Sequence, residues 1–203
     1  MPERCILNSL IIPVYKNEPN ISDLLGVLRS LAEKIRDFEV VFVVDGSPDL
    51  SWAMLHEALP GENFSSQLIL LSRNFGSSTA IRVGMEHARG SLIAVMAADL
   101  QEPPELIEKF FLLLEGGDID IVIGQRRGRE DPWLTSVFSR IYWSLYRRFI
   151  NSEIPDGGVD VFACNEKVLK TLVSLREQNT YISILLFWVG FRRAFVSYER
   201  QKR

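Results

Sequence analysis

The residues best suited to chemistry in this sequence are carboxylates placed directly after apolar runs. Asp99 ends the apolar run 92–98 and is followed by Gln101 and a double proline. Asp45 follows the almost continuously apolar run 38–44 and begins a polar turn, 45–49. The carboxyl edge of a buried sheet is where open α/β folds bind ligands. Because hard oxygen ligands suit Mg²⁺ or Mn²⁺, the two loops together favour a nucleotide-diphosphate site held through a divalent cation.

Each of these carboxylates, taken alone, also has a purely structural explanation. Asp45 is a common turn residue, and Asp99 by itself would be explained as a cap of the next helix. Glu102 and Glu105 are predicted in the first turn of that helix, where negative charge favours the helix dipole. A structural role is therefore the simpler interpretation of these two glutamates.

Strands and helices alternate along the chain and define the elements that must position the carboxylates. Strands are predicted at 7–15, 38–44, 67–72, from residue 92, and at 119–124. Helices are predicted at 21–35, capped by Asn20, and at 77–88 and 103–114. The repeated β-α order implies an α/β fold with a mainly parallel sheet.

Composition bounds the class of protein. With 203 residues and 47% hydrophobic content, the chain can bury one sizeable core, which favours a single domain. The net charge of −3 gives no broad electrostatic case for nucleic-acid binding. Cys5 and Cys164 indicate neither a zinc site nor a disulfide framework, so a reduced compartment is the default. His56 and His87 fall in predicted helices, and neither is expected to be catalytic.

Two apolar segments raise the question of membrane contact. No signal peptide is predicted, and the longest apolar run, 181–191, is shorter than the about 20 residues that span a bilayer. The chain is therefore expected to be soluble or peripheral. Residues 133–150 form a basic, aromatic, amphipathic segment that suits a lipid headgroup interface. The alternative, for this segment and for 181–191, is ordinary packing against the sheet.

Several motifs occur in the order typical of one family. They are Ile12-Pro13-Val14-Tyr15, Val44-Asp45-Gly46-Ser47-Pro48-Asp49, Ser72-Arg73-Asn74-Phe75-Gly76, Asp99-Leu-Gln-Glu-Pro-Pro-Glu105, 124–129, Ser139-Arg140, 156–160, 188–191 and 198–203. With these motifs the chain resembles glycosyltransferase family 2, and within it the polyprenyl-phosphate sugar transferases that include dolichyl-phosphate mannose synthase.

The resemblance implies a GT-A fold with a Rossmann-like nucleotide-sugar-binding half. The chain would be a single catalytic domain, with a donor-binding half at about 1–126 and an acceptor- and membrane-facing half at about 127–203. It would be an inverting transferase that moves a sugar from a nucleotide diphosphate to a polyprenyl phosphate for cell-envelope glycan synthesis. A uridine diphosphate sugar is favoured on family frequency, with GDP-mannose as the other candidate. The expected location is the cytoplasmic face of a membrane, with a homo-oligomer as one arrangement.

The resemblance also assigns roles to individual residues. Catalytic roles fall on Asp99 and Asp160, and the divalent cation, Mg²⁺ or Mn²⁺, on Asp99 and Gln101. Donor-binding roles fall on Pro13, Tyr15, Glu18, Asp45, Arg73, Asp99 and Arg203, with Asp45 contacting the nucleobase. Acceptor-phosphate roles fall on Arg126, Arg129 and Arg140, whose planar guanidinium groups suit phosphate oxygens. Because a phosphate acceptor is already ionised, Asp160 would orient groups and would not need to act as a strong base.

The sequence departs from the family pattern at several positions. Ala97 stands where the family usually has the first Asp of Asp-Ala-Asp, so metal binding is expected to be weaker or differently built. Val44 replaces a further acid, and Glu18 is the only acid of the first loop. The family's Arg-x-x-Gly pattern would begin at Arg203, so the chain is expected to stop short of its natural end, before transmembrane helices.

Two other functions stay open. A soluble family-2 transferase acting on a glycan hydroxyl would need a general base, which gives Asp160 a larger role. Alternatively, Ala97 and Val44 would fit a nucleotide-binding module that has lost catalysis.

Overall fold

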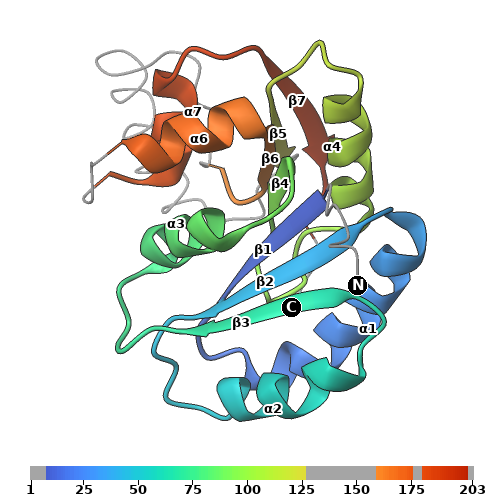
Figure 1. The fold of residues 1–203 in the computed structure, drawn as a ribbon, viewed down its shortest axis with the longest axis vertical. Helices are drawn as coiled ribbons and strands as arrows, with labels where there is room; N and C mark the ends of the chain where they lie inside the picture. The colour runs from blue at the N-terminus through green and yellow to red at the C-terminus, as the bar shows by residue number, and fades with distance from the viewer. Residues whose placement is uncertain (1–7, 127–158, 176–179, 201–203) are drawn as a thin grey trace, which may run out of the picture.

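The computed structural model describes residues 8–126, 159–175 and 180–200. These residues form one seven-stranded sheet in the order β3-β2-β1-β4-β6-β5-β7, covered by helices (Figure 1). The strands are β1 (Asn8–Val14), β2 (Phe38–Val44), β3 (Ser65–Leu70), β4 (Leu92–Val95), β5 (Ile121–Arg126), β6 (Phe162–Asn165) and β7 (Arg193–Tyr198). The α-helices are α1 (Ile21–Lys34), α2 (Ser51–Ala58), α3 (Ser77–His87), α4 (Glu105–Glu115), α6 (Glu166–Ser174) and α7 (Ile182–Trp188).

The sheet is mainly parallel, as the β-α alternation predicts. β1 pairs in parallel with β2 and with β4, and β2 pairs in parallel with β3. β6 is the exception, because it runs antiparallel to both β4 and β5, whereas β5 and β7 are parallel. Strand boundaries differ slightly from prediction: β3 covers 65–70 where 67–72 was expected, and β5 covers 121–126 where 119–124 was expected.

Apolar side chains on alternating positions of the strands feed two cores, one on each face of the sheet. On β1, Leu10 and Ile12 belong to the core beneath α1, α2 and α4, and Ile11 belongs to the core beneath α3, α6 and α7. Figure 1 shows these two helical layers on opposite sides of the sheet. Because both faces are covered, β2 is buried along its whole length, which explains why all of its residues except Glu39 are apolar.

The segment 181–191 is divided between core and surface. Leu185 and Phe187 of α7 are buried, which confirms the packing alternative for these side chains. Tyr181 and Trp188, by contrast, are 67% and 68% exposed. Residues 133–150 lie outside the described residues. Among the helices that the structure describes, none combines the length and apolar character that a membrane crossing requires.

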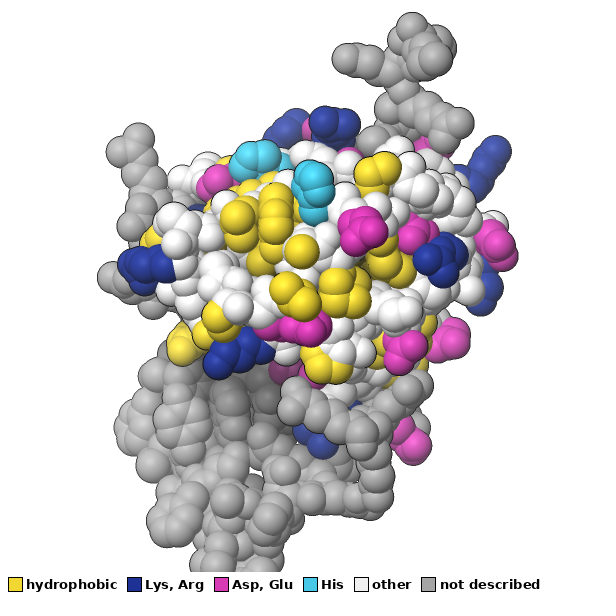
Figure 2. Space-filling model, turned by 90° about the horizontal axis from the view of Figure 1, so that it is seen from below, with side chains coloured by type: hydrophobic (Ala, Val, Ile, Leu, Met, Phe, Trp, Pro, Cys, Tyr) yellow, Lys and Arg dark blue, Asp and Glu magenta, His cyan; other side chains and the backbone are white. Residues whose placement is uncertain are grey.

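The two histidines lie on the surface. His56 is in α2 and His87 ends α3, as predicted, and both are exposed. Figure 2 shows them on one face beside a group of hydrophobic side chains, with carboxylates nearby. Cys164 is a buried free thiol, and burial raises its pKa to about 12.

Asp120, at the start of β5, joins three segments through its carboxylate. It accepts hydrogen bonds from Arg192 Nε (2.9 Å) and from Asn165 Nδ2 (3.0 Å). The bonds from Arg192 hold the pKa of Asp120 at about 2, below its ordinary 3.8. A lowered pKa adds stability above pH 4, and this stability is lost as the pH falls from about 4 towards 2.

We therefore expect Asp120→Asn to lower the free energy of unfolding at pH 7 by about 1–2 kcal/mol, because it removes a charge-assisted hydrogen bond. The difference from the parent protein should shrink as the pH falls from about 4 to 2. Urea unfolding at several pH values measures this. Asp118→Asn, which removes an exposed charge two residues away, is the matched control. A difference that stays constant between pH 7 and pH 2 would contradict the assignment.

Candidate functional site

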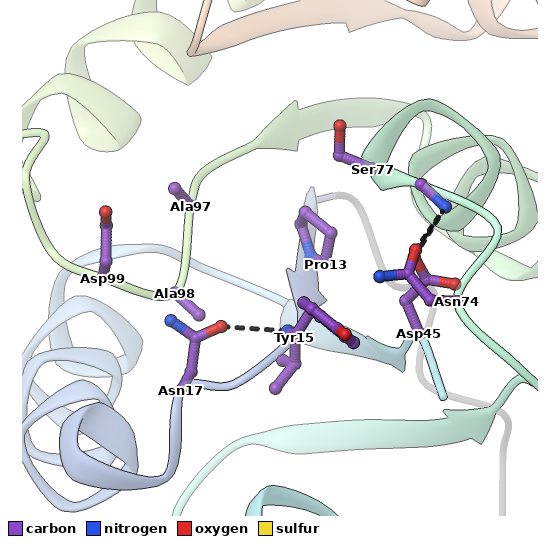
Figure 3. A pocket seen from close by; sticks show the side chains of 11 residues that line it. Pro13, Tyr15, Asn17, Asp45, Asn74, Ser77, Ala97, Ala98 and Asp99 are labelled. Atoms are coloured by element: carbon purple, nitrogen blue, oxygen red, sulfur yellow. Dashed lines mark hydrogen bonds between the residues drawn. The ribbon is translucent and has the colours of Figure 1, made fainter. Parts of the chain in front are cut away.

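A pocket of about 350 Å³ opens at the carboxyl edge of the sheet, where β1 and β4 diverge. The strand order turns at this point, since β2 and β3 lie on one side of β1 and β4 on the other. Such a switch point is the usual ligand site of an open α/β sheet. The lining residues come from four loops and are Pro13, Val14, Tyr15, Asn17, Asp45, Asn74, Gly76, Ser77, Ala97, Ala98 and Asp99 (Figure 3).

Pro13 fits the middle of the sheet because the ladder on its open side has already ended. The carbonyl of Ile11 accepts the last bond from the β4 side, from the Met96 amide at 3.2 Å. Val14 faces the other way, and its carbonyl accepts from the Asp45 amide at 2.9 Å. By alternation, the missing N–H of Pro13 falls on the β4 side, so no ladder bond is lost. This divergence creates the pocket.

Asp45 holds the loop that forms one wall of the pocket. Its side chain is buried, and its two oxygens accept hydrogen bonds from the amides of Phe75 and Gly76, both at 2.8 Å. Gly46 follows with φ 56°, and a Cβ there would overlap the backbone of Arg73. The loop after β2 and the loop after β3 are therefore packed backbone to backbone. The contact of Asp45 with a nucleobase remains a prediction.

Glu18 and Asp49 tie the first loop to the start of α2. Glu18 Oε2 accepts from the Leu50 amide at 3.0 Å, and Asp49 Oδ2 accepts from the Glu18 amide at 3.0 Å. Burial tends to raise the pKa of Asp49, but hydrogen bonds from Ser47, Glu18 and Ser51 outweigh it and hold the pKa at about 2. Glu18 does not line the pocket. No role was predicted for Asp49 from the sequence, although an Asp beside Ser residues is typical of such local capping.

The segment from Ala97 to Asp99 forms the opposite wall, and a turn at Leu100 and Gln101 follows it. Leu100 has φ 55°, a left-handed conformation that costs a non-glycine residue about 1–2 kcal/mol. Its side chain packs against the core, and the Gln101 amide donates to Asp99 Oδ1 at 3.3 Å. This turn places Asp99 in the pocket, whereas Gln101 is not among the lining residues. Strain of this kind is often found at functional sites.

The donor set fits a cation that arrives with a phosphate ligand. Within the described ranges, no group of three or more His, Cys, Asp or Glu side chains is placed to hold a metal ion. Asp99 lines the pocket, while Ala97 contributes no oxygen and both oxygens of Asp45 accept backbone bonds. Mg²⁺ is commonly bound by one or two carboxylates, substrate phosphates and water. The residues present fit that kind of binding and do not form an all-protein metal cage.

A second group of charged side chains lies at the same sheet edge, outside the pocket lining. Glu102 is fully buried, and Arg200 Nε lies 3.8 Å from its Oε1. Burial, and then the negative charge of Asp99, raise the pKa of Glu102 to about 7, against the lowering effect of Arg200. Asp160 raises it further, and burial raises the pKa of nearby Tyr198. Such perturbed groups concentrate at functional sites.

The position of Glu102 corrects the sequence analysis. α4 begins at Glu105, after Pro103 and Pro104, so Glu102 precedes the helix and is not in its first turn. Its burial also places it away from solvent, unlike the exposed Glu105. The simple account of Glu102 as a charge that favours the helix dipole is therefore wrong. No local sequence signal reveals this, because its cationic neighbour, Arg200, comes from the segment after β7.

The structure brings together part of the predicted site. Four predicted residues line the pocket: Pro13, Tyr15, Asp45 and Asp99. They converge as expected, although β2 and β4 are not adjacent, because β1 lies between them. Arg73 is not among the lining residues, and its guanidinium carbon lies 4.0 Å from the centre of the Phe75 ring. Arg129, Arg140 and Arg203 lie outside the described residues. The lining residues with polar side chains that were not among the predicted site residues are Asn17, Asn74 and Ser77.

Comparison with known proteins identifies the class. Residues 9–173 match Glycosyl transferase family 2, and the chain belongs to this family. An undecaprenyl-phosphate 4-deoxy-4-formamido-L-arabinose transferase from Edwardsiella ictaluri is 34% identical over 180 residues, covering 87% of this chain and 54% of the relative. The putative glycosyltransferase CsbB of Bacillus subtilis is 32% identical over 97% of this chain and 60% of its own length. The chain thus spans little more than half of these relatives.

The fold has well-defined structural neighbours. Glucosyl-3-phosphoglycerate synthase from Mycobacterium tuberculosis, in complex with Mn²⁺, UDP-glucose and phosphoglyceric acid, superimposes with a TM-score of 0.71 at 16% identity. The match covers 97% of this chain and 72% of that chain. At this identity the likeness shows the fold alone. Together with the family match, it confirms the GT-A-like α/β fold.

Proposed function

We propose that this domain transfers a sugar, with inversion, from a nucleotide-diphosphate sugar to a polyprenyl phosphate. The observation that carries the proposal is the pocket at the switch point, where the loop held by Asp45 faces Asp99. The undecaprenyl-phosphate substrate in the name of the Edwardsiella ictaluri relative supports the acceptor class. A uridine diphosphate sugar is the favoured donor, with GDP-mannose as the other candidate, and the site of action is the cytoplasmic membrane face.

The residues divide into donor and acceptor groups. Tyr15 and Asn74 line the part of the pocket proposed for the nucleoside, and Asp99 the part proposed for the diphosphate. Asp99 and Gln101 would hold a divalent cation, which, when bound, offsets the charge on the leaving diphosphate. We propose that this cation is Mg²⁺ or Mn²⁺ and that it enters the pocket together with the donor.

The residues proposed to bind the acceptor include one at the end of β5 and one just before β6. Arg126 ends β5, and Asp160 precedes β6 at an exposed position. We propose that Arg126, with Arg129 and Arg140, receives the acceptor phosphate. Because that phosphate is already ionised, its attack on the anomeric carbon needs no strong general base. Asp160 then orients groups around the acceptor.

A nucleotide panel tests the donor half of the proposal. The protein would be heated with uridine, guanosine, cytidine or thymidine diphosphate, or the corresponding sugars, each with Mg²⁺, Mn²⁺ or a chelator. A ligand that binds only the folded state raises the melting temperature, and it raises it more the more tightly it binds. Stabilisation by one nucleotide class, lost with chelator, is expected. Absence of stabilisation by every donor would overturn the proposal.

A transfer assay tests the acceptor half. Radiolabelled sugar would be followed into undecaprenyl phosphate in detergent, beside a glycan acceptor that offers only hydroxyl groups. Label in the lipid fraction supports the proposal, whereas label only in the glycan supports the hydroxyl alternative. In that case Asp160→Asn should abolish turnover, because a hydroxyl acceptor needs a general base. With a phosphate acceptor, the same variant should keep measurable turnover.

A further inference from the structure

Glu102 is a buried carboxylate with no role in the mechanism above. It is fully buried between the Asp99 turn and the start of α4. Neither of its oxygens accepts a hydrogen bond from another described residue. An ionised side chain is costly to bury unless it is paired. Nothing in the helix requires it, because the exposed Glu105 already supplies negative charge to the first turn of α4.

The cationic neighbour of Glu102 comes from the far end of the chain. Arg200 follows β7, and its Nε lies 3.8 Å from Glu102 Oε1, within ion-pair range but too far for a hydrogen bond. This Nε is also buried without a hydrogen-bond partner in the described part of the chain, and so is Nε of Arg126 on the neighbouring strand β5. Glu102 therefore pairs the donor-side turn with the segment that follows β7.

The turn next to Glu102 needs such an anchor. Leu100, between Asp99 and Gln101, has a left-handed backbone conformation. This conformation is strained, so the turn would relax to another conformation if neighbouring contacts did not fix it. On one side, the Leu100 side chain packs against the core. On the carboxyl-terminal side of Leu100, the first charged side chain is that of Glu102. Pro103 and Pro104 follow it and restrict the backbone there.

We propose that Glu102 is a positioning residue, which pairs with Arg200 to hold the Asp99 turn in its catalytic geometry. The inference rests on the proposed function, since Asp99 is the group that it positions. Glu102 does not line the pocket. Its pairing makes the donor-side turn depend on the position of the strand end that carries Arg200.

Kinetics of paired substitutions test this role. Glu102→Gln keeps the size of the side chain and removes its charge, and we expect it to lower kcat by roughly 10- to 100-fold, the usual effect of losing a group that orients a site residue. The KM for the acceptor should change little. Arg200→Gln should cause a similar loss, the double variant should be no worse than either single variant, and Arg200→Lys should restore part of the rate. Glu105→Gln is the matched control and should keep the parent rate.

Hydrogen exchange supplies a measurement that does not depend on activity. Amides of residues 99–102 should exchange faster in Glu102→Gln and in Arg200→Gln than in the parent protein, while those of β1 and β2 stay unchanged. Unchanged exchange in the turn, or additive kinetic losses in the double variant, would overturn the proposal. If Glu102→Gln does not fold, the partly exposed Arg200 variants carry the test alone. A parent protein with no transfer activity would refute the proposed function, but exchange would still report whether the pair holds the turn.

Discussion

Replacing Asp99 with Asn is expected to lower turnover by about 10²- to 10³-fold, the usual effect of removing one electrostatic contact to developing charge. Asp99 is placed in the pocket by a strained turn, and the neighbouring Ala97 has no oxygen to replace it. Asn has the same shape and keeps an acceptor oxygen for the Gln101 amide, so the turn should survive. Initial rates at saturating donor, with Mg²⁺ and with Mn²⁺, measure the effect.

Position 97, on the same wall of the pocket, offers a gain-of-function comparison. Ala97→Asp adds the carboxylate that the family pattern has at this point, and the Ala97 side chain already faces the pocket (Figure 3). We expect it to lower the Mn²⁺ concentration needed for half-maximal stabilisation of the nucleotide complex. In the Ala97→Asp background, Asp99→Asn should cost less than it does alone. Asp118→Asn, an exposed substitution outside the pocket, is the control. Parental turnover in Asp99→Asn would refute the assigned role of Asp99.

The fold could be predicted in outline because its central strands carry strong local signals. Residues 38–44 are apolar except for Glu39, and the structure buries all of them in β2. The helix at 21–35 has regularly spaced apolar residues, and it forms α1. The antiparallel strand β6 was not predicted. Its four residues, Phe162–Asn165, form a strand because they pair with β4 and β5, and a short stretch of sequence does not indicate this long-range pairing.

The candidate site could be predicted where it follows from the sheet alone. Asp45 and Asp99 both follow buried strands, and the carboxyl ends of parallel strands meet at one edge, so their convergence was foreseeable. The bonds of Asp45 to the loop after β3 were not foreseeable, because they join residues 30 and 31 positions apart. Nor was the burial of Glu102 beside Arg200, nearly a hundred residues later in the chain.

Asp45→Asn is expected to weaken both the pocket wall and nucleotide binding. Each carboxylate oxygen accepts one backbone N–H, and an amide offers only one oxygen, so the second N–H would face an NH₂ group. Losing a hydrogen bond to a charged group costs about 1.5–3 kcal/mol, which should appear as a lower free energy of unfolding in urea. If the loop is no longer held in place, its contacts with the nucleotide are lost together. Nucleotide binding should therefore also weaken by roughly tenfold or more.

The pattern of the loss separates two roles for Asp45. If Asp45 acts by holding the loop, its replacement weakens uridine and guanosine diphosphates by similar factors, since every nucleotide meets the same displaced wall. If it contacts the base directly, the loss falls mainly on the nucleotide whose donor groups it accepts. Asn74→Ala provides the comparison, because Asn74 lines the pocket and accepts from the Gly76 amide at 2.9 Å without being buried. The geometry favours the loop-holding role, because both Asp45 oxygens already accept backbone hydrogen bonds.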